Sequence, residues 1–188
     1  MKELPRREAR QVFKRCMDTK AARIEMLASL LLTSGVELTT SDAGVQAVND
    51  WFFTYVEADP ERPGWMLPIW YSVCHDVALF LGDVMIERHP NLRWEFHTWG
   101  KRKVAYQSHV IMGFSTEDPK FHTCIMVEGG VVTYGSRIIA SRGSIATYGT
   151  VEIRGQKIDI DAVVAGAHNR EVETDAFARW MKDVDRRA

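Results

Sequence analysis

The change of hydrophobic period within residues 68–114 constrains the fold more than any other feature of this sequence. Residues 68–89 repeat apolar side chains at helical spacing, and Pro90 ends that helix. Apolar side chains then alternate along residues 92–96, as in a strand with one buried face. A long buried helix that leads directly into a sheet is typical of an α+β domain.

Three further helices are expected before this one. The first covers residues 5–16, the second covers residues 18–33, and the third begins at Ser41 or Asp42, either of which can cap a helix. We therefore expect residues 1–89 to be mainly helical, with about four N-terminal helices.

Residues 90–161 predict an antiparallel sheet of five to seven strands, because short apolar runs there are separated by turn residues. Residues 154–156 form the most hairpin-like turn, and residues 170–186 return to helical spacing as a closing helix. The prediction is one α+β domain over residues 1–188, with the helices packed on the sheet. The expected strands are residues 92–99, 103–107, 109–114, 122–127, 131–140, 145–153 and 157–161.

Gly82 interrupts an otherwise strong helix, where glycine typically costs up to about 1 kcal/mol relative to alanine. We infer that another backbone or a large side chain approaches the helix closely at this point. Trp94 is expected to pack against the same helix, since it shares a strand face with Leu92 and Phe96.

The charge balance argues against a partner that binds through electrostatics alone. Lys and Arg total 24 against 25 Asp and Glu, which gives a net charge of −1. Nucleic acids and anionic membranes release many counterions on binding and favour a basic protein, so we expect neither as a partner. Residues 1–23 are locally basic, which we interpret as the solvated face of an amphipathic helix. Contact with DNA or RNA through this helix is the weaker alternative.

The three cysteines, Cys16, Cys74 and Cys124, are far apart and lie in apolar contexts. The sequence has no CxxC pair, so neither a disulfide framework nor a zinc finger is indicated. Each cysteine is interpreted as a small buried hydrophobe in a reducing compartment. The N-terminal region shows no signal-like apolar core, and its MLASLLL stretch is too short to span a bilayer. We expect a cytoplasmic protein.

Three histidines form the most enzyme-like constellation. His97, His109 and His122 fall on three predicted strands and could converge on zinc if those strands were neighbours, as in open catalytic sites. This supports the alternative hypothesis of a small metal-dependent hydrolase. Strand alternation places His97 on the polar face, so three solvent-facing histidines are the simpler interpretation.

The Cys74-His75-Asp76 sequence does not predict a catalytic triad. Consecutive helical residues point roughly 100° apart and cannot face one another, and no motif names partners from elsewhere. We expect no catalytic residue and no cofactor.

One further pattern combines a helix that ends in a leucine-glycine-acid step with a proline and a strand tryptophan. The residues that form it are Trp70, Asp76, Leu81-Gly82-Asp83, Pro90, Leu92 and Trp94. This pattern resembles a recurrent module of uncharacterised bacterial domain families. Some proteins of this kind lie beside secreted toxins as immunity proteins, so the resemblance implies a non-enzymatic bacterial cytoplasmic protein and no active site.

The leading functional hypothesis is therefore a non-catalytic, immunity-like domain that binds a protein partner. Trp65 and Trp99 lie in or beside loops and could supply aromatic anchors. Asp76, Asp83 and Glu87 follow one edge of the helix over residues 68–89 and would steer a basic, toxin-like partner. Homo-oligomerisation is left open by the sequence.

Overall fold

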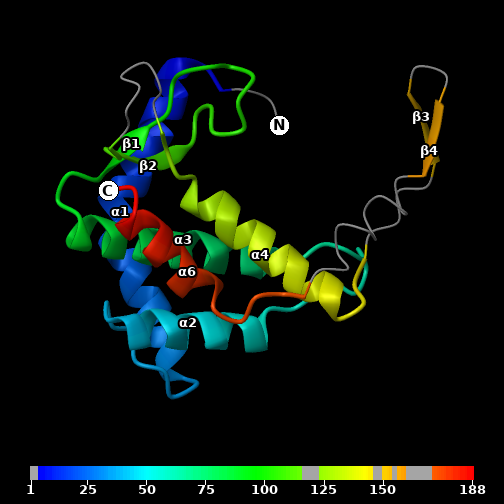
Figure 1. Ribbon diagram of the computed structural model, residues 1–188, viewed down its shortest axis with the longest axis horizontal. Helices are drawn as coiled ribbons and strands as arrows, with labels where there is room; N and C mark the ends of the chain where they lie inside the picture. The colour runs from blue at the N-terminus through cyan, green and yellow to red at the C-terminus, as the bar shows by residue number, and fades with distance from the viewer. Residues whose placement is uncertain (1–3, 116–122, 146–149, 154–155, 160–170) are drawn as a thin grey trace.

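The computed structural model describes residues 4–115, 123–145, 150–153, 156–159 and 171–188. These residues form five helices and two separate two-stranded antiparallel sheets (Figure 1). Most of the core lies between helices, so the described part of the chain is predominantly helical.

Helix α1 is a single 27-residue helix, Arg6–Leu32, where two helices were predicted. Asp18 does not cap a second helix. Its carboxylate lies 2.9 Å from the Lys14 ammonium one turn earlier, a pairing that supports a continuous helix. The chain turns away at Gly35, whose φ of 75° suits glycine at a helix end.

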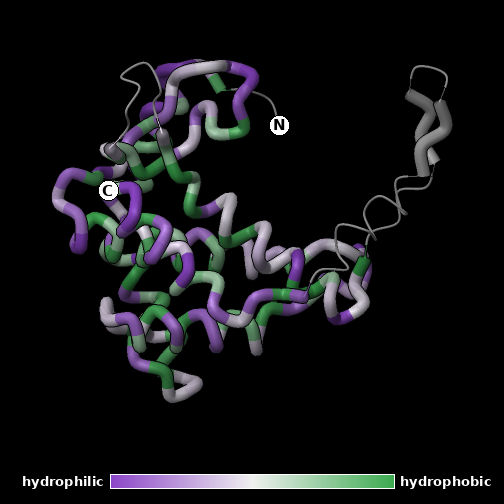
Figure 2. The backbone as a smooth tube through the Cα atoms, viewed as in Figure 1, coloured by the Kyte–Doolittle hydropathy of each residue, from purple (hydrophilic) through white to green (hydrophobic). Residues whose placement is uncertain are grey.

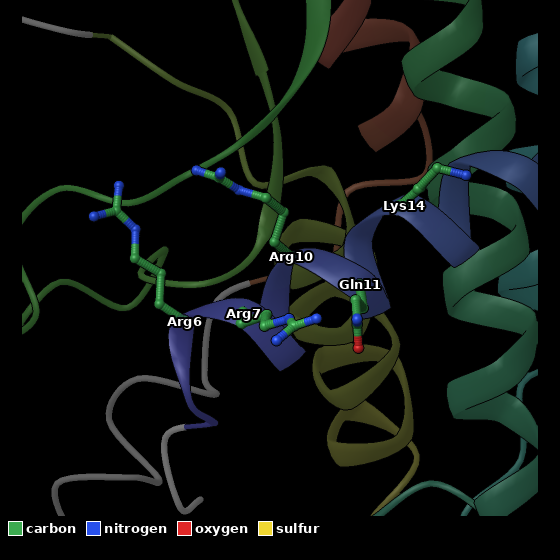
Figure 3. A pocket seen from close by; sticks show the side chains of 5 residues that line it. All are labelled: Arg6, Arg7, Arg10, Gln11 and Lys14. Atoms are coloured by element: carbon green, nitrogen blue, oxygen red, sulfur yellow. The ribbon is translucent and has the colours of Figure 1, made fainter.

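The exposed side at the start of α1 is strongly hydrophilic. Figure 2 shows polar residues concentrated there and in the turn that follows the first strand. The side chains of α1 that project from this side are Arg6, Arg7, Arg10, Gln11 and Lys14 (Figure 3).

Helix α2, Asp42–Tyr55, begins where it was predicted. The Ser41 hydroxyl accepts a 3.1 Å hydrogen bond from the Gly44 amide and so caps the first turn. Phe52 is fully buried and its ring packs against those of Trp70 and Tyr134. Aromatic contacts of this kind join α2 to the helices that follow.

Helix α3, Pro68–Arg88, is the centre of the fold and packs against α1, α4 and α6. Pro68 occupies the first turn, where the missing amide donor costs nothing. The helix is long and apolar enough to cross a membrane, but 67% of its most apolar window is buried within the structure. This burial is the pattern of a core helix in a soluble protein.

The first sheet pairs β1, Arg93–Phe96, with β2, His109–Met112. In the register Phe96 lies opposite His109 and Trp94 lies opposite Ile111. A second pair, β3 (Thr150–Ile153) and β4 (Gln156–Asp159), forms the hairpin predicted around residues 154–156.

The predicted sheet of five to seven strands is wrong for the part of the chain that the structure describes. Residues 103–107 form turns, and residues 123–126 contribute a single bridge from Ile125 to Ile111. Residues 131–140, predicted as a strand, belong to helix α4, Val127–Ser141.

Helix α4 explains the largest part of that error. Its valines, isoleucines and tyrosine favour a strand by composition. Their spacing is helical, however, and the apolar face they form packs along α3. Tertiary packing against α3 therefore decides the conformation. The buried residues that form this face are Val127, Val131, Tyr134, Gly135, Ile138, Ile139 and Ala140.

Helix α6, Ala176–Asp185, confirms the predicted closing helix but begins later than predicted, since residues 171–175 are not helical. Buried Asn49 holds its beginning. The Asn49 amide donates to the Thr174 carbonyl at 2.6 Å, and its oxygen accepts from the Phe177 amide at 3.2 Å. Both polar ends of this buried side chain are satisfied.

The close approach inferred at Gly82 is confirmed. A Cβ at this position would lie 2.1 Å from Cζ2 of Trp94, so only glycine leaves room for the indole. Nε1 of Trp94 donates to Oδ1 of Asp83 at 2.9 Å. Trp94 thus anchors the first sheet to α3, although the side chain is half-buried rather than fully enclosed.

Candidate metal-binding site

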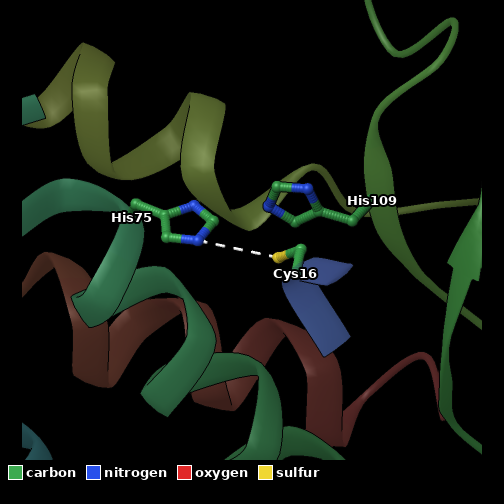
Figure 4. Close-up of side chains that lie close together, drawn as sticks. All are labelled: Cys16, His75 and His109. Atoms are coloured by element: carbon green, nitrogen blue, oxygen red, sulfur yellow. Dashed lines mark hydrogen bonds between the residues drawn. The ribbon is translucent and has the colours of Figure 1, made fainter. Parts of the chain in front are cut away.

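Three metal-ligating side chains from three different elements converge at one point (Figure 4). Cys16 comes from the middle of α1, His75 from the first half of α3, and His109 is the first residue of β2. One potential ligand atom from each residue lies within 4.8 Å of the other two.

Two ion pairs hold α1 across α3 and so bring Cys16 to His75. The Lys20 ammonium lies 2.5 Å from Asp83, and the Arg23 guanidinium donates to both oxygens of Asp76 at 2.5 and 2.8 Å. A bidentate pair fixes geometry as well as distance. The position of Cys16 against α3 is therefore set by charged contacts on the turns that follow it.

Glu128, in the first turn of α4, joins the two histidines. Its Oε2 lies 3.2 Å from Nδ1 of His75 and 2.8 Å from Nε2 of His109. The other ring nitrogen of His75, Nε2, lies 3.6 Å from Sγ of Cys16. One carboxylate thus orients both imidazoles, whose ring centroids are 5.3 Å apart and perpendicular.

Nε2 of His109 is buried and has no aligned hydrogen bond. Glu128 is close enough to attract it electrostatically, but the angles do not make the 2.8 Å contact a hydrogen bond. A buried polar nitrogen without an aligned partner requires an explanation, and a bound ion is one of the standard ones.

The charges at the site favour a cation. Burial raises the pKa of Glu128, but the close contacts of its carboxylate with His109 and His75, and the charges of the two imidazoles, outweigh burial and lower this pKa to about 2. The contacts of His75 with Cys16 and then with Glu128 overcome burial and raise the His75 pKa to about 10. Without a metal, the positive charge of the protonated His75 ring balances the negative charge of the Glu128 carboxylate. A bound metal ion would supply that positive charge in place of the proton.

The site is partly open to solvent. The side chains of His75, His109 and Glu128 are 25%, 17% and 33% exposed, and Cys16 is half-buried. An ion could therefore enter, and a water molecule could complete its coordination. Cys74, the neighbour of His75 in sequence, is different: burial, and then the charge of Glu128, raise its pKa to about 12, so it remains a protonated core thiol.

The histidine trio predicted from sequence is only partly brought together. His109 lies in the site, whereas His97 is buried with 4% exposure, is not one of the converging residues, and packs its ring near Trp99. His122 lies outside the described residues. The expectation that His97 faces solvent is wrong, because the strand ends at Phe96 and the alternation does not extend to it.

Sequence reasoning missed Cys16, His75 and Glu128. Cys16 and His75 are 59 residues apart, and His75 and Glu128 are 53 apart, so no spacing motif links them. The one usable signal was that Cys16 lies on the apolar side of its helix, the side that must pack against another element.

Two of the three acidic residues proposed for partner binding make contacts within the chain. Asp76 is 7% exposed and pairs with Arg23, and Asp83 accepts hydrogen bonds from Lys20 and Trp94. Both carboxylates therefore hold elements of this chain together. Glu87 is exposed.

The loop tryptophans are exposed but do not share a surface. Trp65 is 52% exposed and Trp99 is 44% exposed. Their loops lie apart in Figure 1: residues 56–67 lie beside the C-terminal end of α4, and residues 97–108 lie beside the start of α1. Partner binding through either tryptophan stays a prediction, but a single anchor that combines them does not fit this arrangement.

No family model, curated protein or solved structure matches this chain. The functional argument therefore depends on the site.

Proposed function

We propose that the protein binds one zinc-type transition-metal ion through Cys16, His75 and His109. The observation that carries this proposal is the convergence of the three ligand atoms within 4.8 Å of one another. One thiol and two imidazoles form a donor set that suits zinc, which binds cysteine sulfur and histidine nitrogen in tetrahedral sites.

The arrangement favours a catalytic rather than a purely structural site. Three protein ligands and solvent access leave a fourth position for water, whereas structural zinc sites are closed by four protein ligands. Bound zinc lowers the pKa of such a water to about 7. We therefore propose a small metal-dependent hydrolase, in which Glu128 orients His75 through Nδ1 as carboxylates commonly orient metal-bound histidines.

A specific observation supports a second candidate function. Cys16 Sγ, the His75 ring and Glu128 Oε2 are aligned in the order thiol, imidazole and carboxylate, with separations of 3.6 and 3.2 Å. This is the order of groups in thiol-dependent hydrolases. In this alternative, Cys16 is the nucleophile and the site functions without a metal.

The described cysteines are free, which fits a reducing compartment, and we propose a cytoplasmic location. The exposed side chains of Trp65 and Trp99 support the remaining possibility, a non-catalytic role in binding a protein partner.

Metal analysis of untagged protein, reconstituted with zinc and dialysed, tests the proposal. We expect about one equivalent of zinc in the wild type and a loss of most of it in Cys16→Ala and His109→Ala. Cys124→Ala and His89→Gln are matched controls, since both residues lie outside the converging group, and both variants should retain the metal. Absence of zinc from the folded wild type would overturn the proposal, and selective alkylation of Cys16 in that protein would then support the thiol alternative.

A further inference from the structure

A basic surface lies at the start of α1, outside the group of candidate metal ligands. Residues 4–17 carry five cationic side chains and one acidic side chain, Glu8. Arg6, Arg7, Arg10 and Lys14, together with Gln11, line an open hollow of about 680 Å³. In Figure 3 the side chains of Arg6 and Arg10 extend away from the helix on the same side.

The loop over residues 97–108 enlarges this basic surface. Nε2 of Gln107 donates to the Leu4 carbonyl at 2.7 Å and holds the loop beside the start of α1 (Figure 1). The loop carries Lys101, Arg102 and Lys103 and no acidic residue. Two segments far apart in sequence therefore form one basic end on a chain whose net charge is −1.

Of the cations on this surface, Lys14 pairs with Asp18 one turn later on the same helix. Within the part of the chain that the structure describes, no ion pair involves Arg6, Arg7 or Arg10. Lys20 and Arg23, farther along the same helix, are the residues that pair with α3. Lys20 and Arg23 thus attach α1 to α3, whereas the three arginines at its beginning are not used in ion pairs among the described residues.

We propose that this basic end binds the phosphate backbone of single-stranded nucleic acid. Arginine dominates the α1 part of the surface, and its planar guanidinium recognises phosphate in a bidentate manner. Trp99, 44% exposed on the same loop as Lys101 and Arg102, provides a ring face on which an unstacked base can lie. Aromatic faces beside a basic track are the usual means of binding single strands without sequence preference. The net charge of the whole chain argues against such a partner, but it does not show that basic residues are gathered at one end of the molecule.

Fluorescence anisotropy of a labelled oligothymidylate tests the proposal. We expect saturable binding at about 50 mM salt that weakens linearly with the logarithm of salt concentration. Arg6→Gln/Arg10→Gln should weaken binding about tenfold or more and reduce the salt slope by about 1.4, since each single-strand phosphate contact contributes roughly 0.7. The matched control is Arg179→Gln/Lys182→Gln, which removes the same charge from exposed positions on α6.

Three results would overturn the inference. The first is no binding by the wild type at low salt, and the second is an equal loss of affinity in the α6 control. The third is displacement of the oligonucleotide by polyglutamate or by phosphatidylserine vesicles at equal charge concentration, which would assign the surface to an acidic protein or a membrane. None of these measurements requires metal, so their failure would leave the zinc proposal unaffected.

Discussion

Substitution of Gly82 by alanine tests the contact that joins the first sheet to α3. The new methyl group would lie 2.1 Å from Cζ2 and 2.5 Å from Cη2 of Trp94, far inside van der Waals contact. The indole must therefore move, and its 2.9 Å hydrogen bond to Asp83 would break or lengthen. His109 is also affected, because its ring centroid lies 5.8 Å from that of Trp94.

The magnitude follows from three opposing contributions. Overpacking costs about 1–3 kcal/mol, and the lost hydrogen bond costs about 1 kcal/mol. Alanine in place of glycine inside a helix returns up to about 1 kcal/mol. We expect Gly82→Ala to lower the free energy of unfolding by about 1–3 kcal/mol, measured by urea denaturation monitored by circular dichroism.

A double-mutant cycle isolates the contact. Trp94→Phe removes Cζ2 and Cη2, the two atoms nearest to a Cβ at Gly82, so Gly82→Ala should be neutral or stabilising in that background. If Gly82→Ala stabilises the wild type, or costs the same in both backgrounds, the close packing of Trp94 on α3 is not what requires glycine.

Three further predictions concern the attachment of α1 and the charges at the site. Arg23→Met should destabilise the protein by about 2–3 kcal/mol in urea denaturation, because it leaves buried Asp76 unpaired. The double variant Arg23→Met/Asp76→Leu should recover much of this loss, and equal stability of the two variants would contradict the role of the pair. The stability of metal-free protein should be greatest between pH 4.5 and 6.5. The stabilisation by ionised Glu128 is lost as the pH falls from 4.5 toward the folded-state pKa of Glu128, about 2. The stabilisation by protonated His75 is lost as the pH rises from 6.5 toward the folded-state pKa of His75, about 10. A thermal-denaturation series should show this profile in the wild type and a flatter one in His75→Gln, and identical profiles would refute it. Zinc should slow hydrogen exchange in the first half of α1, since the metal would tie Cys16 to α3 and β2; unchanged exchange in a zinc-loaded sample would show that the ion binds elsewhere.

The sequence was sufficient to predict the helices that have strong local signals. It was not sufficient for the elements whose conformation depends on tertiary packing. The helix over residues 68–88 and the capped start of α2 were predictable from apolar period, proline and serine. The continuity of α1 through Asp18 was not, because an acidic residue can cap a helix or pair along it, and the Lys14 contact decides between the two. In α4 a strand-like composition concealed a helical period that α3 stabilises.

Of the three residues that converge at the candidate metal site, only His109 was proposed as a ligand from the sequence. His109 was predicted as a candidate metal ligand because it falls, like His97 and His122, on a predicted strand. Cys16 and His75 meet because α1 crosses α3 under the Arg23–Asp76 and Lys20–Asp83 pairs, and a crossing point depends on tertiary contacts that no single segment encodes. The same contacts explain why Asp76 and Asp83, which the sequence suggested as part of a partner surface, are used in contacts within the chain.

X-ray absorption at the zinc edge of zinc-loaded protein tests the central claim most directly. The account predicts one sulfur ligand at about 2.3 Å and two or three nitrogen or oxygen ligands at about 2.0–2.1 Å, with the sulfur contribution lost in Cys16→Ser and retained in Cys124→Ser. A zinc spectrum without sulfur in the wild type, or one whose sulfur survives in Cys16→Ser, would contradict the metal site proposed for this fold.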